Sequence, residues 1–463
     1  MYALEKNGLD NYLWDIVKDM NSNLTATVNT KHGKTKEFPT KDNIRQGGVL
    51  SVMMYALLMD EIAKEVDQEN EGIPLPNSNK NIGCLLWMDD VVLIHESAEG
   101  LQNLLNTTNK IAKKYHIAFG KEKSKAMYIG RGNQKKEKEK PLKLGDMEIE
   151  YTKKYKYLGE TINDKLNMEN QIAEIKRKVE AAFQTILVIA GDKELKNIRM
   201  KTIWKLLEVC IKPIITYAAE TWKTTKKEMS EINSIFDKII KRTLKLPTTT
   251  PREILYLETQ LTDIRHTKEK NQVMMLHRLL NTKNTLIPTI ISDYKETSWA
   301  QQTRNLMQSY KSDQIIDMNT NNASTHLGKQ TKIKEIEDMK ETGQEKSKVK
   351  FYLENSQDNL NGKRPKYLDE LTRNEASAIF RGRARMIHAK SNYKNKYSNL
   401  LCRGCGLTEE SQMHILNDCK EIHKDDLNKV TTQEIFNNNL NQEQMKEIAR
   451  KIYQTESTIN QGT

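Results

Sequence analysis

The chain has 463 residues, 37% hydrophobic and 29% charged, which is enough for ordinary buried cores in two or three domains. It has no run of about 18 apolar residues and no apolar leader, which excludes a membrane span and predicts an intracellular protein, nuclear or cytoplasmic. Lys and Arg (74) outnumber Asp and Glu (62), and the net charge of +12 suits a polyanionic partner.

The first 165 residues predict a mixture of helices and short strands, because the spacing of apolar residues switches between the helical period and the alternation typical of strands. The expected elements are, in chain order, helix 4–20, hairpin 24–39, helix 50–66, hairpin 82–94, helix 97–115, strand 126–129, connector 131–141, and strands 147–151 and 155–161.

Helical spacing alone continues from Met168 to about residue 310. Residues 311–365 are rich in Asn, Lys, Gln, Glu and Ser, which predicts a flexible or loosely helical linker. A helix over 367–388 and a cysteine cluster follow. The predicted domains are therefore an α+β domain at 1–165, a helical region at 166–310, the linker at 311–365, a basic helix with a metal module at 366–425, and a helical tail at 426–463.

Two adjacent carboxylates, Asp89 and Asp90, stand between two apolar runs in the sequence WMDDVVLI. Neighbouring acids at such a join mark a tight turn, where their oxygens could hold magnesium. A bare pair of this kind is more often a solvated hairpin tip. Upstream, IRQGG (44–48) precedes a helix, so that its glycines and the helix amides could approach a phosphate or template strand. A plain glycine loop that caps a helix is the alternative.

The spacing Cys402-x2-Cys405-x8-His414-x4-Cys419 provides four zinc ligands, and Gly404 and Gly406 let the backbone fold around a metal. We expect a segment with such a site, residues 367–425, to fold only with zinc. His423 follows outside the spacing and is interpreted as a surface residue or as a support for the ligands.

A basic stretch at 380–397 precedes the cysteines and carries six Lys or Arg residues with no acid. Basic side chains contact phosphates and aromatic rings stack on unpaired bases, so the stretch is a candidate nucleic-acid contact. A solvated helix end is the alternative interpretation. The residues proposed for this contact are Arg381, Arg383, Arg385, Lys390 and Tyr393.

The order RQGG, WMDD, KEKSK (121–125) and KYLG (156–159) resembles the palm domain of reverse transcriptases of non-LTR (LINE-like) retrotransposons. IKPIITYAAETW (211–222) resembles their thumb, and the cysteines resemble the motif downstream of it. The resemblance implies an α+β partial right-hand polymerase palm, then an all-α thumb or connection region and a small zinc-binding C-terminal module. It also implies RNA-directed DNA synthesis with magnesium and zinc as metals, and with RNA template, DNA primer or target and deoxynucleotides as partners.

The resemblance also assigns roles to particular positions. Asp89 and Asp90 would hold magnesium, and Lys123 would be the general acid toward pyrophosphate. The nucleotide and template would contact Arg45, Gln46 and Gly47. The primer would contact the turn formed by Tyr157, Leu158 and Gly159.

The sequence departs from the family pattern at three points. Val52 stands after Ser51 where the family has proline, and Met88 stands where alanine is common. The family also has a further aspartate on an upstream strand, whereas Asp10, Asp15 and Asp19 here fit the solvated face of a helix. A truncated or incompletely read element is therefore expected, inactive by itself. The alternative is a non-catalytic nucleic-acid-binding remnant, and a protein-interaction scaffold is a third class.

Overall fold

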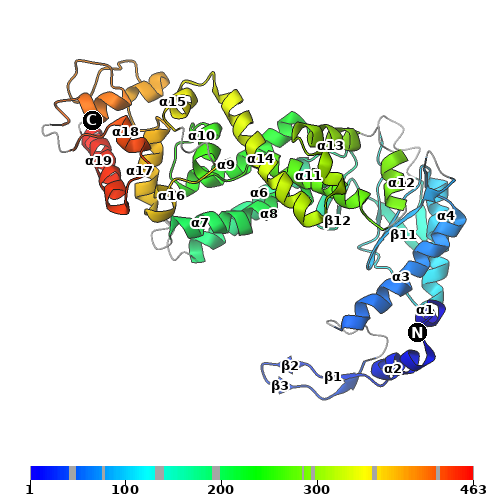
Figure 1. Cartoon of the computed structure of the whole chain (residues 1–463). Coiled ribbons are helices and arrows are strands. Elements are labelled where there is room, and N and C mark those ends of the chain that lie inside the picture. Colours follow the sequence, from blue (N-terminus) through cyan, green and yellow to red (C-terminus); the bar gives the residue numbers. More distant parts are fainter. Residues whose placement is uncertain are drawn as a thin grey trace. The chain divides into compact units, whose positions relative to one another are not determined.

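The computed structural model describes residues 2–40, 48–75, 79–130, 140–189, 199–283, 286–293, 298–356, 362–423 and 428–461 (Figure 1). The chain divides into two compact units, Met1–Leu166 and Asn167–Thr463.

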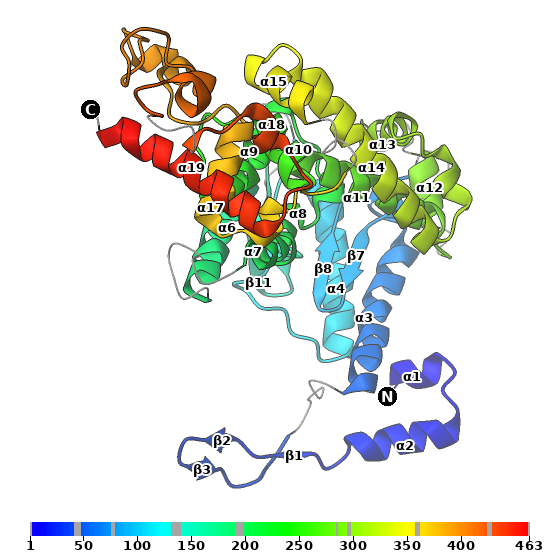
Figure 2. The same cartoon turned by 60° about the vertical axis from the view of Figure 1, so that its left-hand side comes forward.

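Unit 1 is built on two long helices, α3 and α4, which lie side by side next to the hairpin of β7 and β8 (Figure 2). Its core joins Met59, Ile62 and Val66 of α3 to Leu104 and Ile111 of α4. The elements are α1 (Tyr2–Lys6), α2 (Asn11–Asn21), β1 (Thr25–Ala26), β2 (Asn29–Thr30), β3 (Gly33–Lys34), β4 (Phe38–Pro39), α3 (Val49–Glu69), β5 (Ile73–Pro74), β6 (Asn81–Ile82), β7 (Cys84–Trp87), β8 (Asp90–Leu93), α4 (Ala98–Lys114), β9 (Lys125–Ala126), β10 (Leu142–Leu144), β11 (Met147–Tyr151), β12 (Lys154–Tyr157) and β13 (Glu160–Asn163).

The helix predicted over residues 4–20 is two helices. Gly8 has φ +81°, a left-handed conformation that interrupts the helix after α1. Asp10 then caps α2, because its side chain accepts a hydrogen bond from the backbone N–H of Tyr12. The strand predicted at 155–161 is likewise a hairpin, β12 and β13, which turns at Leu158 and Gly159.

Unit 2 is helical, and its largest core runs from Ile172 to Ile459. Trp204 is buried in it and donates its indole N–H to the carbonyl of Leu368, 2.7 Å away. The elements are α6 (Glu169–Ile189), α7 (Met200–Leu206), the π-helical η1 (Leu207–Ile211), α8 (Lys212–Thr216), η2 (Ala219–Thr221), α9 (Lys226–Thr243), α10 (Arg252–Thr259), α11 (Ile264–Leu280), α12 (Leu286–Asp293), α13 (Ser298–Ser309), η3 (Asp313–Asp317), α14 (Thr320–Gly343), α15 (Ser347–Asn355), α16 (Tyr367–Glu370), α17 (Arg373–Arg383), η5 (Lys390–Lys396), the π-helical η6 (His414–Asp418), α18 (Thr432–Phe436) and α19 (Gln442–Gln461).

The interpretation of residues 311–365 as a linker is wrong for the described part of this segment. It forms η3, α14 and α15, and Leu327, Val349 and Tyr352 are completely buried. The buried stripe of α14 repeats every four residues and includes the polar side chains of Thr331 and Glu335. Apolar composition therefore underestimated how much of this helix is packed.

The cysteine region is not a separate module, because it shares one core with the helical region. The helix predicted over 367–388 breaks where Thr372 caps α17, and α17 ends before Arg385, which has φ +50°. The terminal helix α19 packs against α17 (Figures 1 and 2). Gly382 of α17 faces Ile435 and Ile452, so the segment predicted as a tail completes this core.

Candidate functional site

The two aspartates lie at the tip of the β7–β8 hairpin, as the sequence predicted. Trp87 pairs with Asp90 in the antiparallel register, and Met88 and Asp89 form the turn between them. Met88 has φ +55°, an unusual conformation for a non-glycine residue that permits this two-residue turn. Asp89 and Asp90 are both exposed, so their oxygens are available to a ligand.

Two tyrosines from other elements lie within electrostatic reach of this tip. Burial raises the pKa of Tyr55, on α3, and the charge of Asp89 raises it further. Burial and then the charge of Asp90 raise the pKa of Tyr157 at the end of β12 in the same way. The helix after the glycine loop and the second hairpin therefore approach the aspartates.

The described residues do not complete a metal site around these acids. No group of three Asp, Glu, His or Cys ligands with atoms within 4.8 Å of one another includes Asp89 or Asp90 in the part of the chain that the structure describes. The three upstream aspartates are exposed, as predicted: Asp10 caps α2, and Asp15 and Asp19 lie on it. The pair could bind one Mg²⁺ through its hard oxygens, with further ligands from elsewhere.

The other palm positions are only partly described. Arg45, Gln46 and Gly47 lie outside the described residues, and Gly48 is the residue that precedes α3. Lys123 is exposed in a turn, and its carbonyl accepts a hydrogen bond from the hydroxyl of Tyr155 at 2.7 Å. This bond ties the Lys123 turn to the β12–β13 hairpin, whose tip is the predicted primer contact.

The four predicted zinc ligands come together. The ligand atoms of Cys402, Cys405, His414 and Cys419 all lie within 4.8 Å of one another. The Sγ atoms of Cys402 and Cys419 are 3.8 Å apart, and Cys405 Sγ is 3.3 Å from His414 Nε2. A tetrahedral zinc site with ordinary bond lengths separates its ligands by about 3.5–3.8 Å. The Cys402–Cys419 separation falls in this range and the Cys405–His414 separation is slightly shorter, so the four side chains form a candidate metal-binding cluster.

The thiols of this cluster differ in acidity. The backbone N–H of Leu407 donates to the Cys405 sulfur and is the main reason that the pKa of Cys405 is lowered to about 6. Burial raises the pKa of Cys419 to about 11. Cys405 is therefore the more acidic of these two thiols, and metal coordination uses the thiolate form.

Residues that the sequence analysis missed hold the first two cysteines in place. Arg403, between them, pairs with the fully buried Glu410 at 2.6 Å, and Glu410 also accepts the backbone N–H of Arg403. Gly404 packs so closely on Ile422 and Cys419 that a Cβ there would lie 2.8 Å from Ile422. No local sequence motif predicts the role of Glu410, because only the folded loop brings it to Arg403.

His423 is buried, so its interpretation as a surface residue is wrong. Its Nε2 lies 2.8 Å from the carbonyl oxygen of Ile415, and its backbone N–H donates to the carbonyl of Cys419. His423 therefore supports the backbone next to two of the ligands, which was the other interpretation.

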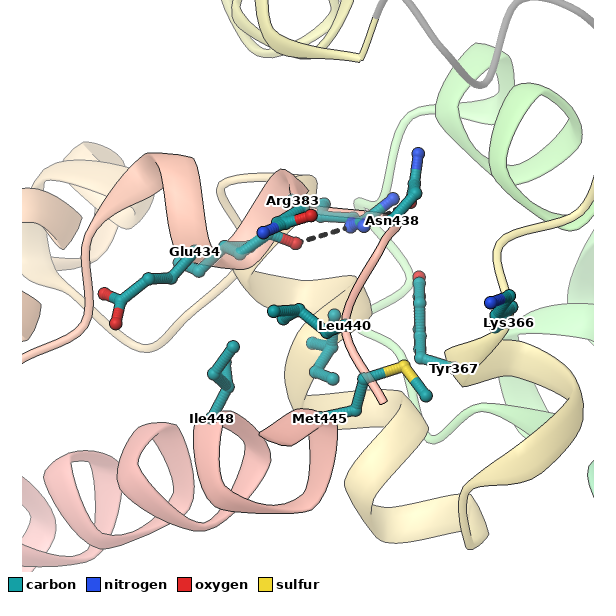
Figure 3. Close-up of a pocket in the computed structure, with 11 residues that line it drawn as sticks. Lys366, Tyr367, Arg383, Glu434, Asn438, Leu440, Met445 and Ile448 are labelled. Carbon is teal, nitrogen blue, oxygen red and sulfur yellow. Dashed lines mark hydrogen bonds between the residues drawn. The ribbon is translucent and has the colours of Figure 1, made fainter. Parts of the chain in front are cut away.

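Burial excludes one arginine of the basic stretch, Arg383, as a nucleic-acid contact, and the other two have partners within the fold. Arg383 is buried and donates to Glu258, Ile435 and Asn438, and it lines a small cavity with Tyr367 (Figure 3). Arg381 pairs with Glu456 at 2.6 Å, and the guanidinium of Arg385 lies 4.2 Å from the ring centroid of Phe351.

The other two residues proposed for the contact also have partners within the fold. Lys390 donates to the carbonyl of Leu401, and the Tyr393 ring packs against His388. Lys394 and Lys396 are exposed, and Lys394 lies 3.5 Å from Glu409 while the Lys396 ammonium lies over the Tyr393 ring.

Comparison with known proteins identifies the class of unit 1. Residues 5–162 match the family model described as reverse transcriptase (RNA-dependent DNA polymerase). A reverse transcriptase domain thus occupies this part of the chain. Across 218 residues the chain is 24% identical to a "Retrovirus-related Pol polyprotein from type-1 retrotransposable element R2" of Nasonia vitripennis. The domain is accordingly of the non-LTR retrotransposon kind.

The similarity covers only parts of both proteins. The match includes 45% of this chain and 20% of the relative, so the chain spans about a fifth of the length of that polyprotein. None of the described helices combines the length and the apolar character needed to cross a membrane.

Proposed function

We propose that this chain contributes to RNA-templated DNA synthesis, with Asp89 and Asp90 as ligands of magnesium. The observation that carries the proposal is the β7–β8 hairpin, which presents both carboxylates at an exposed turn inside the segment that matches the reverse transcriptase family. The proposed substrates are an RNA template, a DNA primer or target and deoxynucleotides.

The chain's own residues have distinct parts in this proposal. Bound magnesium would activate the primer 3′-hydroxyl and stabilise the leaving pyrophosphate. Asp89 and Asp90 would hold it, and Lys123 would donate a proton to pyrophosphate. The turn formed by Tyr157, Leu158 and Gly159 would position the primer. Arg45, Gln46 and Gly47 would contact the nucleotide and template.

A second candidate function is nucleic-acid binding without catalysis. The observation that favours it is the absence of a third ligand around Asp89 and Asp90 among the described residues. Primer extension on an RNA template with magnesium separates the two functions when binding of the same primer–template is measured in parallel. Binding without extension, even with the preceding part of a related polyprotein joined to the chain, would support the second function.

We further propose that Cys402, Cys405, His414 and Cys419 hold one structural zinc. Because these residues belong to a core shared with the rest of unit 2, the test requires the whole chain rather than residues 367–425. Purified protein should contain about one equivalent of zinc, and Cys402→Ser should lose it. Cys210→Ser is the matched control, since Cys210 is an exposed free thiol. Less than about a tenth of an equivalent in the unaltered chain would exclude the site.

The exposed lysines of η5 are the remaining candidates in the basic stretch for a nucleic-acid contact. If Lys394 and Lys396 neutralise phosphates, Lys394→Gln with Lys396→Gln should lower the slope of log affinity against log salt by about 1.4 for single-stranded RNA. The control is Lys446→Gln with Arg450→Gln, which removes equal charge from the exposed face of α19. Equal slopes for the two double variants would place the contact elsewhere in the chain.

A further inference from the structure

A second group of buried charges lies where α11 begins, outside every site described above. Asp263 precedes α11 and is completely buried, as is His266 one turn later. One Asp263 oxygen, Oδ1, lies 2.7 Å from the backbone nitrogen of His266 and 2.8 Å from its Nδ1. The carboxylate thus caps the helix and holds one nitrogen of the imidazole ring.

The other ring nitrogen faces a different helix. His266 Nε2 lies 3.3 Å from Oδ2 of Asp338, which belongs to α14. Arg265 reaches the same carboxylate oxygen at 2.5 Å, and its guanidinium is 3.1 Å from His266 Nε2. The imidazole therefore bridges the start of α11 and the second half of α14.

The charges around the ring come from several elements. Arg252 of α10 contacts Asp263 at 2.6 Å and Asp237 of α9 at 3.3 Å. On α14, Lys334 pairs with Asp338 and Lys332 pairs with Glu335. Glu335 also accepts the backbone N–H of Asp263, and Lys212 of α8 and Glu269 of α11 add charge nearby.

Asp263, His266 and Glu335 have the composition and spacing of a metal site, but their partners argue against one. A metal ligand must offer a bare imidazole nitrogen and an uncommitted carboxylate oxygen. Both nitrogens of His266 instead face a carboxylate, and Arg252 and Lys332 already neutralise the acids. One carboxylate at each ring nitrogen can accept from a doubly protonated imidazole, while the Arg265 guanidinium beside Nε2 opposes its charge.

We propose that His266 is a buried histidinium at neutral pH and that its proton latches α14 to the start of α11. Burial acts to lower the pKa of His266, but hydrogen bonds to Asp263 and Asp338 outweigh it and raise the pKa to about 9. The same bonds hold the pKa values of both aspartates below their usual range.

The direction of the pH effect follows from this shift. A histidine in the unfolded chain has a pKa of about 6.5, so the latch is fully stabilising only below that pH. Its contribution disappears as the pH rises through about 9. Between pH 7 and 10 the folded-to-unfolded ratio of unit 2 should fall on the order of a hundredfold through His266 alone.

Two measurements on the whole chain test the latch. Denaturant unfolding at pH 7 and pH 10 should show the expected fall in the folded-to-unfolded ratio of the unaltered chain. In His266→Gln most of this pH-dependent fall should be absent. His326→Gln is the control, because His326 also belongs to α14 but its ring lies 3.4 Å from Gln314 and away from these acids. This change should leave the loss of stability between pH 7 and pH 10 as it is in the unaltered chain. The pKa of His266 can also be read from imidazole NMR signals of histidine-labelled protein, which does not depend on how well a variant folds.

Three results would overturn the proposal. The first is an imidazole signal of His266 that titrates below pH 7. The second is an equal loss of stability between pH 7 and 10 in His266→Gln and the unaltered chain. The third is a stoichiometric metal that Cys402→Ser retains and His266→Gln loses, which would make the cluster a metal site instead.

Discussion

Asp89→Asn is expected to lower RNA-templated DNA synthesis by about a thousandfold or more, because it removes a carboxylate ligand from the proposed magnesium site. The hairpin register places Asp89 in the turn and Asp90 at the start of β8, so the change leaves the pairing of β7 with β8 intact. Loss of rate without loss of folding is the result that identifies a ligand. The measurement is single-turnover primer extension, with circular dichroism to verify the fold.

The experiment must be done where synthesis can occur. The family pattern includes a further metal-binding aspartate that Asp10, Asp15 and Asp19 do not match, so we expect the 463-residue chain alone to extend a primer no faster than background. Joining it to the part of the R2 polyprotein that the match leaves uncovered should provide activity. Asp146→Asn is the matched control, because Asp146 is an exposed aspartate in the turn between β10 and β11. Extension by the chain alone would show that an acid such as Asp10 or Asp15 completes the site.

The features that the sequence predicted well depend on short segments. The β7–β8 hairpin is specified by two apolar runs around Asp89 and Asp90, and the four proposed zinc ligands lie within residues 402–419. In both cases spacing along the chain determines which side chains can meet. The clustering of the zinc ligands was therefore predictable without a tertiary fold.

The features that it predicted badly depend on distant partners. Arg383 looked like a phosphate contact because its neighbours in the chain are basic, yet its carboxylate partner, Glu258, lies 125 residues earlier. In α14 the polar Glu335 is buried because the N–H of Asp263, 72 residues away, donates to it. Composition counts such residues as exposed, whereas burial is decided by a partner that local patterns do not reveal.

Arg383→Ala is expected to destabilise unit 2 by about 3–5 kcal/mol, the usual cost of removing one partner from a buried ion pair. Arg383 and Glu258 are 2% and 0% exposed, and their side chains meet at 2.9 Å. Glu258 also accepts hydrogen bonds from the hydroxyls of Tyr352 at 2.5 Å and Tyr367 at 2.7 Å. The change would leave this carboxylate buried among α10, α15 and α16 without its guanidinium.

Denaturant unfolding measures this cost, and two comparisons define its origin. Arg450→Ala removes an exposed pair with Glu447 on α19 and should cost about 0–1 kcal/mol. Arg383→Met combined with Glu258→Gln removes both charges, so it should be more stable than Arg383→Ala. If Arg383→Ala instead retained full stability and weakened RNA binding, the arginine would belong to a nucleic-acid surface after all. The buried contacts on α17 predict the opposite, because a side chain enclosed by Glu258, Ile435 and Asn438 has no face left for a phosphate.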